Sequence, residues 1–161
     1  MPNWAEEVTA VATVVLAVGA VAAIGAAVFA GQQVREARIG RQAEVAADFF
    51  ERWSSAPMIE TRRLVASYAT PVELRDAFLR HIEANDVEAY VLYRELDFFE
   101  QLAALEQLGA IDLALVQLLL GSTLSARWDM WKPAIYAAYG EDGHVYPLFE
   151  SLAEKLRPTG T

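Results

Sequence analysis

The longest apolar stretch of the sequence lies near its N-terminus. No residue between Glu7 and Arg35 is charged, and the apolar core of this stretch, Val8–Ala30, has 23 residues. At ~1.5 Å per residue, such a helix crosses a hydrocarbon core of ~30 Å. A buried soluble helix of this length normally carries a polar face, and a cleaved leader normally begins with Lys or Arg. The pattern therefore favours a transmembrane helix over both alternatives.

Small residues recur along this segment. Eleven of its 23 residues are Ala or Gly, and Gly19, Ala23, Ala27 and Gly31 follow one another at four-residue spacing. Such a stripe lets helix backbones approach closely in a bilayer, where packing drives association. We interpret these four residues as an oligomerisation stripe. The alternative is that they reflect only an alanine-rich composition.

A heptad pattern follows the apolar segment. Ile39, Ala43, Ala46, Phe50 and Trp53 are spaced 4-3-4-3, as in a coiled-coil seam. This spacing predicts one continuous helix over about residues 3–54. Two heptads leave two interpretations open. The seam joins copies of the chain, or its last aromatic residues pack into the chain's own domain.

The rest of the sequence indicates helices only, because no window alternates apolar and polar residues with a period of two. Thr70 with Glu73, and Asp112, have the spacing of helix caps, and Gly109 suits a helix end. Gly121 is expected to interrupt the last long helical stretch. The expected helices cover residues 58–67, 71–84, 87–108, 113–120, 122–139 and 146–156.

These elements predict an all-α protein. One long N-terminal transmembrane helix continues into a cytosolic helical bundle of about five or six helices. Residues 1–34 form the tail and membrane helix, 35–54 a juxtamembrane stalk, and 55–161 the bundle. The uncharged stretch 113–126 is too short for a second span and is expected to be a core helix.

The charges beside the apolar segment predict its orientation. Arg35, Arg38 and Arg41 follow it, and only acidic residues precede it. The positive-inside rule then places the C-terminal part in the cytoplasm and the N-terminus outside. Trp4 and the three arginines are expected at the level of the lipid headgroups, where an indole and basic side chains are favoured.

Composition excludes several classes of function. The chain has no cysteine, so it has no disulfide, thiolate metal site or cysteine nucleophile. It carries 13 Lys and Arg against 22 Asp and Glu, a net charge of −9, which opposes binding to nucleic acid. An acidic surface instead suits a basic protein partner.

Motifs for catalysis or cofactor binding are missing from the sequence. It contains no nucleotide-binding loop and no nucleophile elbow. Its two histidines, His81 and His144, lack the ligand spacing of a metal motif. We therefore expect no enzyme activity, no cofactor and no metal.

One acidic cluster remains as a candidate site. Arg94, Asp97 and Glu100 have three-residue spacing beside two phenylalanines, and Arg127 is a further cation for a buried ion pair. A structural ion pair is the simpler interpretation. The alternative is a buried carboxyl with a raised pKa that acts as an acid or base.

Aromatic residues gather in the sequence between residues 128 and 139. Trp128, Trp131 and Tyr139 fall near one face of the expected helix. They indicate either core packing or a subunit interface, where Trp and Tyr are enriched.

Short motifs suggest a family. The segment Asp97-Phe98-Phe99-Glu100, the turn Gly109-x-Ile111-Asp112, Gly121 and Trp128 resemble an uncharacterised family of small bacterial membrane proteins. The resemblance implies one N-terminal transmembrane helix and a helical cytosolic domain in the bacterial inner membrane. It implies no activity.

The expected function is that of a non-enzymatic, single-pass, membrane-anchored interaction or scaffold protein. It contacts membrane lipid, forms a homo-oligomer through its transmembrane helix, and offers its cytosolic domain to a protein partner. The alternative is a homo-oligomeric pore gated by the cytosolic domain. Thr9 and Thr13 lie one helical turn apart and would line its outer end.

Overall fold

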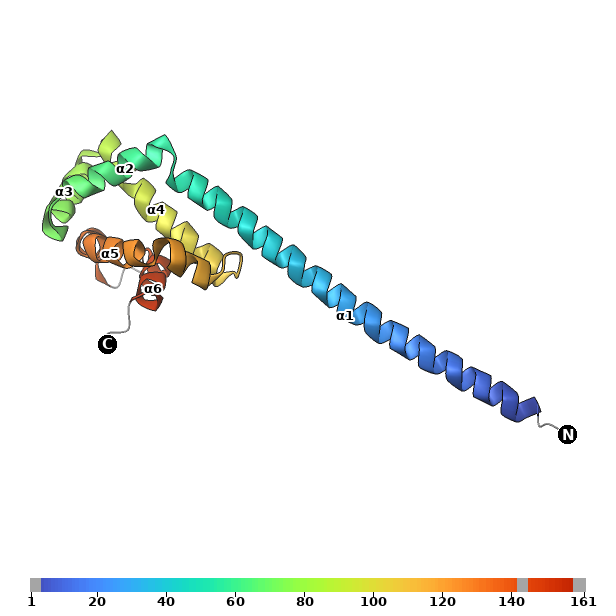
Figure 1. Cartoon of the computed structure of the whole chain (residues 1–161). Coiled ribbons are helices and arrows are strands. Elements are labelled where there is room, and N and C mark those ends of the chain that lie inside the picture. The colour runs from blue at the N-terminus through green and yellow to red at the C-terminus, as the bar shows by residue number, and fades with distance from the viewer. Residues whose placement is uncertain (1–3, 142–144, 158–161) are drawn as a thin grey trace. The chain divides into compact units, whose positions relative to one another are not determined.

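The regular structure of the described residues is entirely helical. The computed structural model describes the backbone of residues 4–141 and 145–157, and the side chains of residues 26, 27, 29–141 and 145–157. Over these residues the chain has six helices and no strand, which confirms the all-α class (Figure 1). They are α1 (Trp4–Trp53), α2 (Ala56–Ser67), α3 (Pro71–Ala84), α4 (Val87–Gln107), α5 (Leu113–Tyr139) and α6 (Pro147–Lys155).

The chain divides into two compact units, Met1–Arg41 and Gln42–Thr161. In the first unit, every described side chain from Ala26 to Arg41 is exposed. Where side chains are described, no helix combines the length and the apolar character that a bilayer crossing needs. Most of the predicted span, with Trp4, Gly19 and Ala23, lies outside those residues, so the membrane helix stays a prediction.

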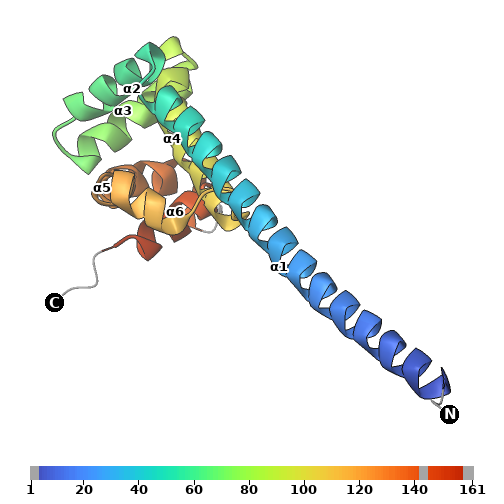
Figure 2. The same ribbon diagram turned by 45° about the vertical axis from the view of Figure 1, so that its right-hand side comes forward.

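The second unit is a bundle built around α4. This helix contacts α2, α3 and α6, while α5 packs on α3 and α6 (Figure 2). Buried residues of α4 recur every three or four positions, as the core face of an amphipathic helix requires. They are Ala89, Leu92, Glu95, Leu96, Phe98, Phe99, Leu102 and Ala103.

The last turns of α1 belong to this bundle. Phe49 and Trp53 are buried, and their rings lie 4.8 Å and 5.0 Å from the Phe98 ring. Trp53 also lies 5.4 Å from Phe99, whose ring stacks on Phe149 at 4.8 Å. The end of the heptad pattern therefore packs into the chain's own domain. This is the second of the two interpretations left open by the sequence.

The first part of that pattern differs from its end. Ile39 and Ala43 are exposed, whereas Ala46 is buried and Phe50 is partly buried against the core. Contact between α1 and the bundle begins at Gln42, whose side-chain amide donates a hydrogen bond of 3.0 Å to the carbonyl of Gly109.

Most of the expected helix ends are confirmed. The side chain of Thr70 accepts a hydrogen bond from the Glu73 N–H at 3.2 Å, and that of Asp112 accepts one from the Ala114 N–H at 2.7 Å. Gly109 has a φ of +68°, a left-handed conformation that suits glycine just after a helix.

The expected break at Gly121 is wrong, because α5 runs without interruption from Leu113 to Tyr139. One glycine inside a helix costs only about 1 kcal/mol relative to alanine. Burial of Leu120 and Leu124 on either side outweighs that cost. The hydroxyl of Ser125 donates to the Gly121 carbonyl at 3.1 Å, so this polar side chain is satisfied within the helix.

Phe99→Ala tests the aromatic core. Because this ring is fully buried among Trp53, Phe98 and Phe149, we expect the free energy of unfolding to fall by about 3–5 kcal/mol. Chemical denaturation followed by tryptophan fluorescence measures this change. The matched control is Val87→Ala at the exposed start of α4, with an expected change within about 0.5 kcal/mol. Equal losses from both variants would contradict the described core.

Candidate functional site

Glu95 is the charged residue that the bundle buries most completely. Its side chain is fully buried in α4. One carboxyl oxygen, Oε2, accepts a hydrogen bond of 3.0 Å from the indole Nε1 of Trp131. The other, Oε1, lies 3.3 Å from Nε of Arg127, whose side chain is 18% exposed. An acid from α4 and two partners from α5 thus meet inside the core.

Burial raises the pKa of Glu95 above its ordinary value of 4.5. The positive charge of Arg127 opposes this shift most strongly, followed by the Trp131 hydrogen bond and the charge of Arg62. Burial has the largest effect because removing a carboxylate from water strongly disfavours its charged form. The site therefore favours the neutral acid more than an exposed glutamate does.

The predicted ion pair is not formed as expected. Arg127 does face a buried carboxylate, but that carboxylate belongs to Glu95, which lies between two of the predicted residues in the sequence. Arg94 instead donates to the Pro57 carbonyl at 2.9 Å and to the Thr61 hydroxyl at 3.3 Å. The predicted partners Asp97 and Glu100 form other contacts. The three-residue spacing places them beside the core stripe of α4, whereas Glu95 lies within it.

Asp97 and Glu100 both bind the start of α6. Asp97 is exposed and accepts a hydrogen bond of 3.2 Å from the Tyr146 hydroxyl. The carboxylate of Glu100 accepts hydrogen bonds from the backbone N–H groups of Leu148 at 3.3 Å and Phe149 at 2.8 Å. The residue at the N-cap position of α6, Tyr146, makes no side-chain cap of its own. Glu100 therefore supplies the missing cap from a neighbouring helix.

The predicted interface aromatics belong largely to the core. Trp128 and Trp131 are buried, with ring contacts to Phe149 at 5.0 Å and Phe78 at 5.4 Å. They therefore offer no surface to a partner, and the core interpretation holds for both. Tyr139 remains partly exposed, and its hydroxyl pairs with that of Tyr93.

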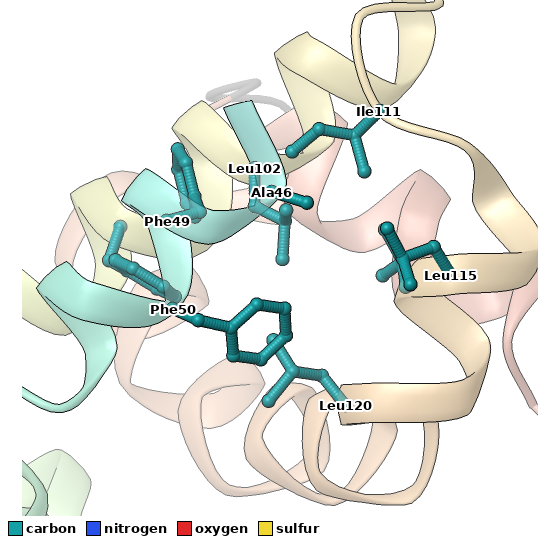
Figure 3. A pocket seen from close by; sticks show the side chains of 9 residues that line it. Ala46, Phe49, Phe50, Leu102, Ile111, Leu115 and Leu120 are labelled. Carbon is teal, nitrogen blue, oxygen red and sulfur yellow. The ribbon is translucent and has the colours of Figure 1, made fainter. Parts of the chain in front are cut away.

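An apolar hollow lies between the end of α1, α4 and the start of α5 (Figure 3). It has no polar lining and holds about one group the size of a water molecule, besides space open to solvent. That volume is too small for a substrate. The lining residues are Ala46, Phe49, Phe50, Phe98, Leu102, Ile111, Leu115, Val116 and Leu120.

One group among the described residues has the spacing of metal ligands. Oxygen or nitrogen atoms of His81, Asp86 and Glu88 lie within 4.8 Å of one another. The carboxylate of Asp86 already pairs with the His81 ring at 2.8 Å and accepts the Ala89 N–H at 3.1 Å. These contacts account for the proximity of the three residues without a metal ion, because Asp86 caps the N-terminus of α4 and pairs with His81. The second histidine, His144, lies outside the described residues.

Comparison with protein families gives one match. The model of the family DUF4760, a domain of unknown function, matches residues 13–156. The chain belongs to the DUF4760 family. This confirms the expected membership of an uncharacterised family, while the membrane location implied by the resemblance stays a prediction. No curated protein and no solved structure matches the chain.

In this DUF4760 chain, the contacts of Glu95 are made inside the core. The carboxyl group of Glu95 is closed off from solvent, so no substrate reaches it in this conformation. The sequence contained a signal for this residue, because Glu95 continues the core spacing of Leu92, Phe99 and Leu102. A charged residue on an apolar stripe is expected to be buried with a partner.

Glu95→Gln tests the raised pKa. Since the folded chain holds this proton to a higher pH than the unfolded chain, the neutral acid supports folding fully below about pH 4.5, and this contribution is lost as the pH rises through the folded-state pKa. We expect the stability of wild type relative to Glu95→Gln to fall as the pH rises above about 4.5, because the unfolded chain releases this proton before the folded chain does. Urea unfolding at each pH measures the difference.

Arg127→Met extends this test, since it removes the cation that favours the charged carboxylate. We therefore compare Arg127→Met with the double variant Arg127→Met/Glu95→Gln. The stability of Arg127→Met relative to the double variant should keep falling to a higher pH than the stability of wild type relative to Glu95→Gln. A wild-type advantage over Glu95→Gln that grows with pH would show that the ion pair, and not burial, governs Glu95.

Glu100→Ala tests the cap of α6. It leaves the N–H groups of Leu148 and Phe149 without an acceptor, so we expect a loss of about 1–2 kcal/mol in the free energy of unfolding. Glu100→Gln keeps one carbonyl oxygen and should lose less. The exposed Gln107 on the same helix provides the control, because Gln107→Ala should change stability by less than about 0.5 kcal/mol.

Proposed function

We propose that this DUF4760 chain is a membrane-anchored, non-enzymatic interaction protein that self-associates through its N-terminal helix. One observation carries the proposal. The 23-residue stretch Val8–Ala30 has no charge and is followed by Arg35, Arg38 and Arg41. Its length suits a bilayer and the arginines suit the cytoplasmic side, so the bundle is a cytoplasmic domain of a single-pass protein of the plasma membrane.

The chemistry of the bundle supports a binding role over catalysis. Its buried acid, Glu95, is held by Arg127 and Trp131 inside the core, away from solvent. The tryptophans of the bundle and most of its phenylalanines pack in the core, and the hollow between α1 and α5 is apolar and small. A catalytic site needs polar groups that converge on an accessible space. These described features supply a stable scaffold instead.

The small-residue stripe supports self-association. Its described members, Ala27 and Gly31, are exposed, and a methyl group added to Gly31 would meet nothing within 4 Å. A helix surface without protruding side chains allows a second backbone to approach closely. The whole stripe, from Gly19 to Gly31, therefore suits contact between helices of two copies.

Gly19→Leu combined with Ala23→Leu tests this role. Two bulky side chains on the stripe separate the helices, so we expect the oligomer to dissociate to monomers in nanodiscs or mild detergent. Mass photometry or light scattering of the full chain measures the particle. Val21→Leu lies on the other side of the helix and should leave the oligomer intact. A wild-type chain that is monomeric at membrane concentrations would contradict the proposal.

Ion flux separates the scaffold from the pore alternative. The scaffold predicts that liposomes holding the assembled chain stay impermeable to ions. Flux that Thr9→Val and Thr13→Val abolish would favour the pore instead.

A further inference from the structure

Two arginines approach Glu95 from different helices. Arg127 of α5 has its Nε 3.3 Å from the carboxyl oxygen Oε1, and the positive charge of Arg62, from α2, also acts on Glu95. The Oε1 atom of Glu95 and the Nε atom of Arg62 are both buried, and neither has a hydrogen-bond partner among the described residues. A buried acceptor and a buried donor without partners are rare in a folded protein and call for a physical explanation.

Arg62 lies next to the end of α1 as well as to the buried acid. Its guanidinium carbon is 4.5 Å from the centre of the Trp53 ring. Trp53 in turn lies 5.4 Å from Phe99, which follows Glu95 by one turn of α4. The residues that precede Arg62 and Glu95 in their own helices are hydrogen-bonded to each other at 3.3 Å. Arg62 is therefore a neighbour of an aromatic ring of α1 and of the carboxyl group of α4.

The contact that Arg62 makes with Trp53 suits a neutral Glu95. Burial raises the pKa of Glu95, so this carboxyl group keeps its proton to a higher pH than an exposed glutamate does. A neutral carboxyl group attracts a cation only weakly, whereas the face of an indole ring attracts a guanidinium through its quadrupole. Arg62 accordingly lies over Trp53, and its Nε is left without a partner.

Loss of the proton from Glu95 reverses this preference. An ionised carboxylate in a core is strongly unfavourable unless cations or hydrogen-bond donors reach it. In surroundings of low dielectric constant, a full negative charge attracts a cation more strongly than an aromatic ring does. Arg127 already lies beside Oε1, and the unpartnered Nε of Arg62 offers a second donor.

The charged groups that face Glu95 are few. Among the described residues, its pKa responds to Arg127 and Arg62, to the hydrogen bond from Trp131, and to burial. Arg94, its neighbour on α4, donates to a backbone carbonyl of α2 instead. The helices α1, α3 and α6 each pack an uncharged aromatic ring against this part of α4, namely Trp53, Phe78 and Phe149.

We propose that Glu95 is a proton-operated switch that controls how firmly the end of α1 is held on the bundle. While Glu95 is neutral, the guanidinium of Arg62 covers the Trp53 ring and joins α2 to α1. When Glu95 releases its proton to solvent, Arg62 turns from the ring to the carboxylate, and α1 loses this contact. The inference concerns the bundle alone, and it stands whether or not α1 crosses a membrane.

Fluorine NMR of the full chain, labelled with 5-fluorotryptophan, tests the switch. The chain has four tryptophans, so the resonances are few and are assigned by replacing each tryptophan with phenylalanine in turn. Trp131 reports on Glu95 through its hydrogen bond, and Trp53 reports on the contact with Arg62. As the pH rises above about 4.5, we expect both resonances to shift with one common midpoint.

Three variants separate the parts of the switch. Glu95→Gln cannot ionise, so both shifts should disappear. Arg62→Met removes the link, so the Trp131 resonance should still shift with pH while that of Trp53 no longer does. The matched control, Arg63→Met, removes the same charge from the exposed neighbouring position of α2 and should preserve both shifts. Circular dichroism of each variant establishes that its helices are retained.

Three results would overturn the proposal. A Trp131 resonance that shifts while that of Trp53 stays constant shows that ionisation of Glu95 has no effect at the end of α1. A Trp53 shift that survives Arg62→Met shows that Arg62 is not the link. A wild-type chain in which neither resonance shifts before the helices unfold shows that Glu95 keeps one ionisation state wherever the chain is folded.

Discussion

The packing of Phe49 and Trp53 against Phe98 and Phe99 is the contact on which the arrangement of the bundle depends. It joins the last turns of α1 to α4, and the stack of Phe99 on Phe149 extends it to α6. Aromatic pairs of this kind contribute about 0.5–1.5 kcal/mol each beyond the area that they bury. Because Phe49 and Trp53 lie in the last turns of α1, this contact fixes the end of that helix in the bundle.

Glu95 has a different role in the same core. Burying a carboxyl group among aromatic rings is unfavourable unless each of its oxygens finds a partner. Trp131 of α5 donates a hydrogen bond to Oε2, whereas Oε1 accepts no hydrogen bond and lies 3.3 Å from Nε of Arg127, which also belongs to α5. Glu100 links α4 to α6, because its carboxylate accepts hydrogen bonds from the first backbone N–H groups of α6.

The elements of the bundle were predictable from local signals, and most of its tertiary contacts were not. Thr70, Asp112 and Gly109 marked helix ends because capping depends on residues close in sequence. Gly121 does not end a helix, since burial of the neighbouring leucines outweighs the low helix propensity of one glycine. The sequence indicates Arg127 as the partner of a buried acid, but the spacing among the acids does not point to Glu95, which only the apolar stripe of α4 distinguishes. The cap that Glu100 gives to α6 joins residues 49 positions apart, and no local pattern encodes it.

Membrane anchoring is the claim on which the proposed function rests, and side-specific labelling tests it most directly. In the cysteine-free chain, Asn3→Cys and Ala66→Cys each provide one thiol, and a membrane-impermeant maleimide is applied to intact and to permeabilised bacterial cells that express the chain. We expect Asn3→Cys to be labelled in intact cells and Ala66→Cys only after permeabilisation, and we expect alkaline carbonate to leave both variants in the membrane fraction. Release of the chain by carbonate, with neither thiol labelled in intact cells, would contradict it.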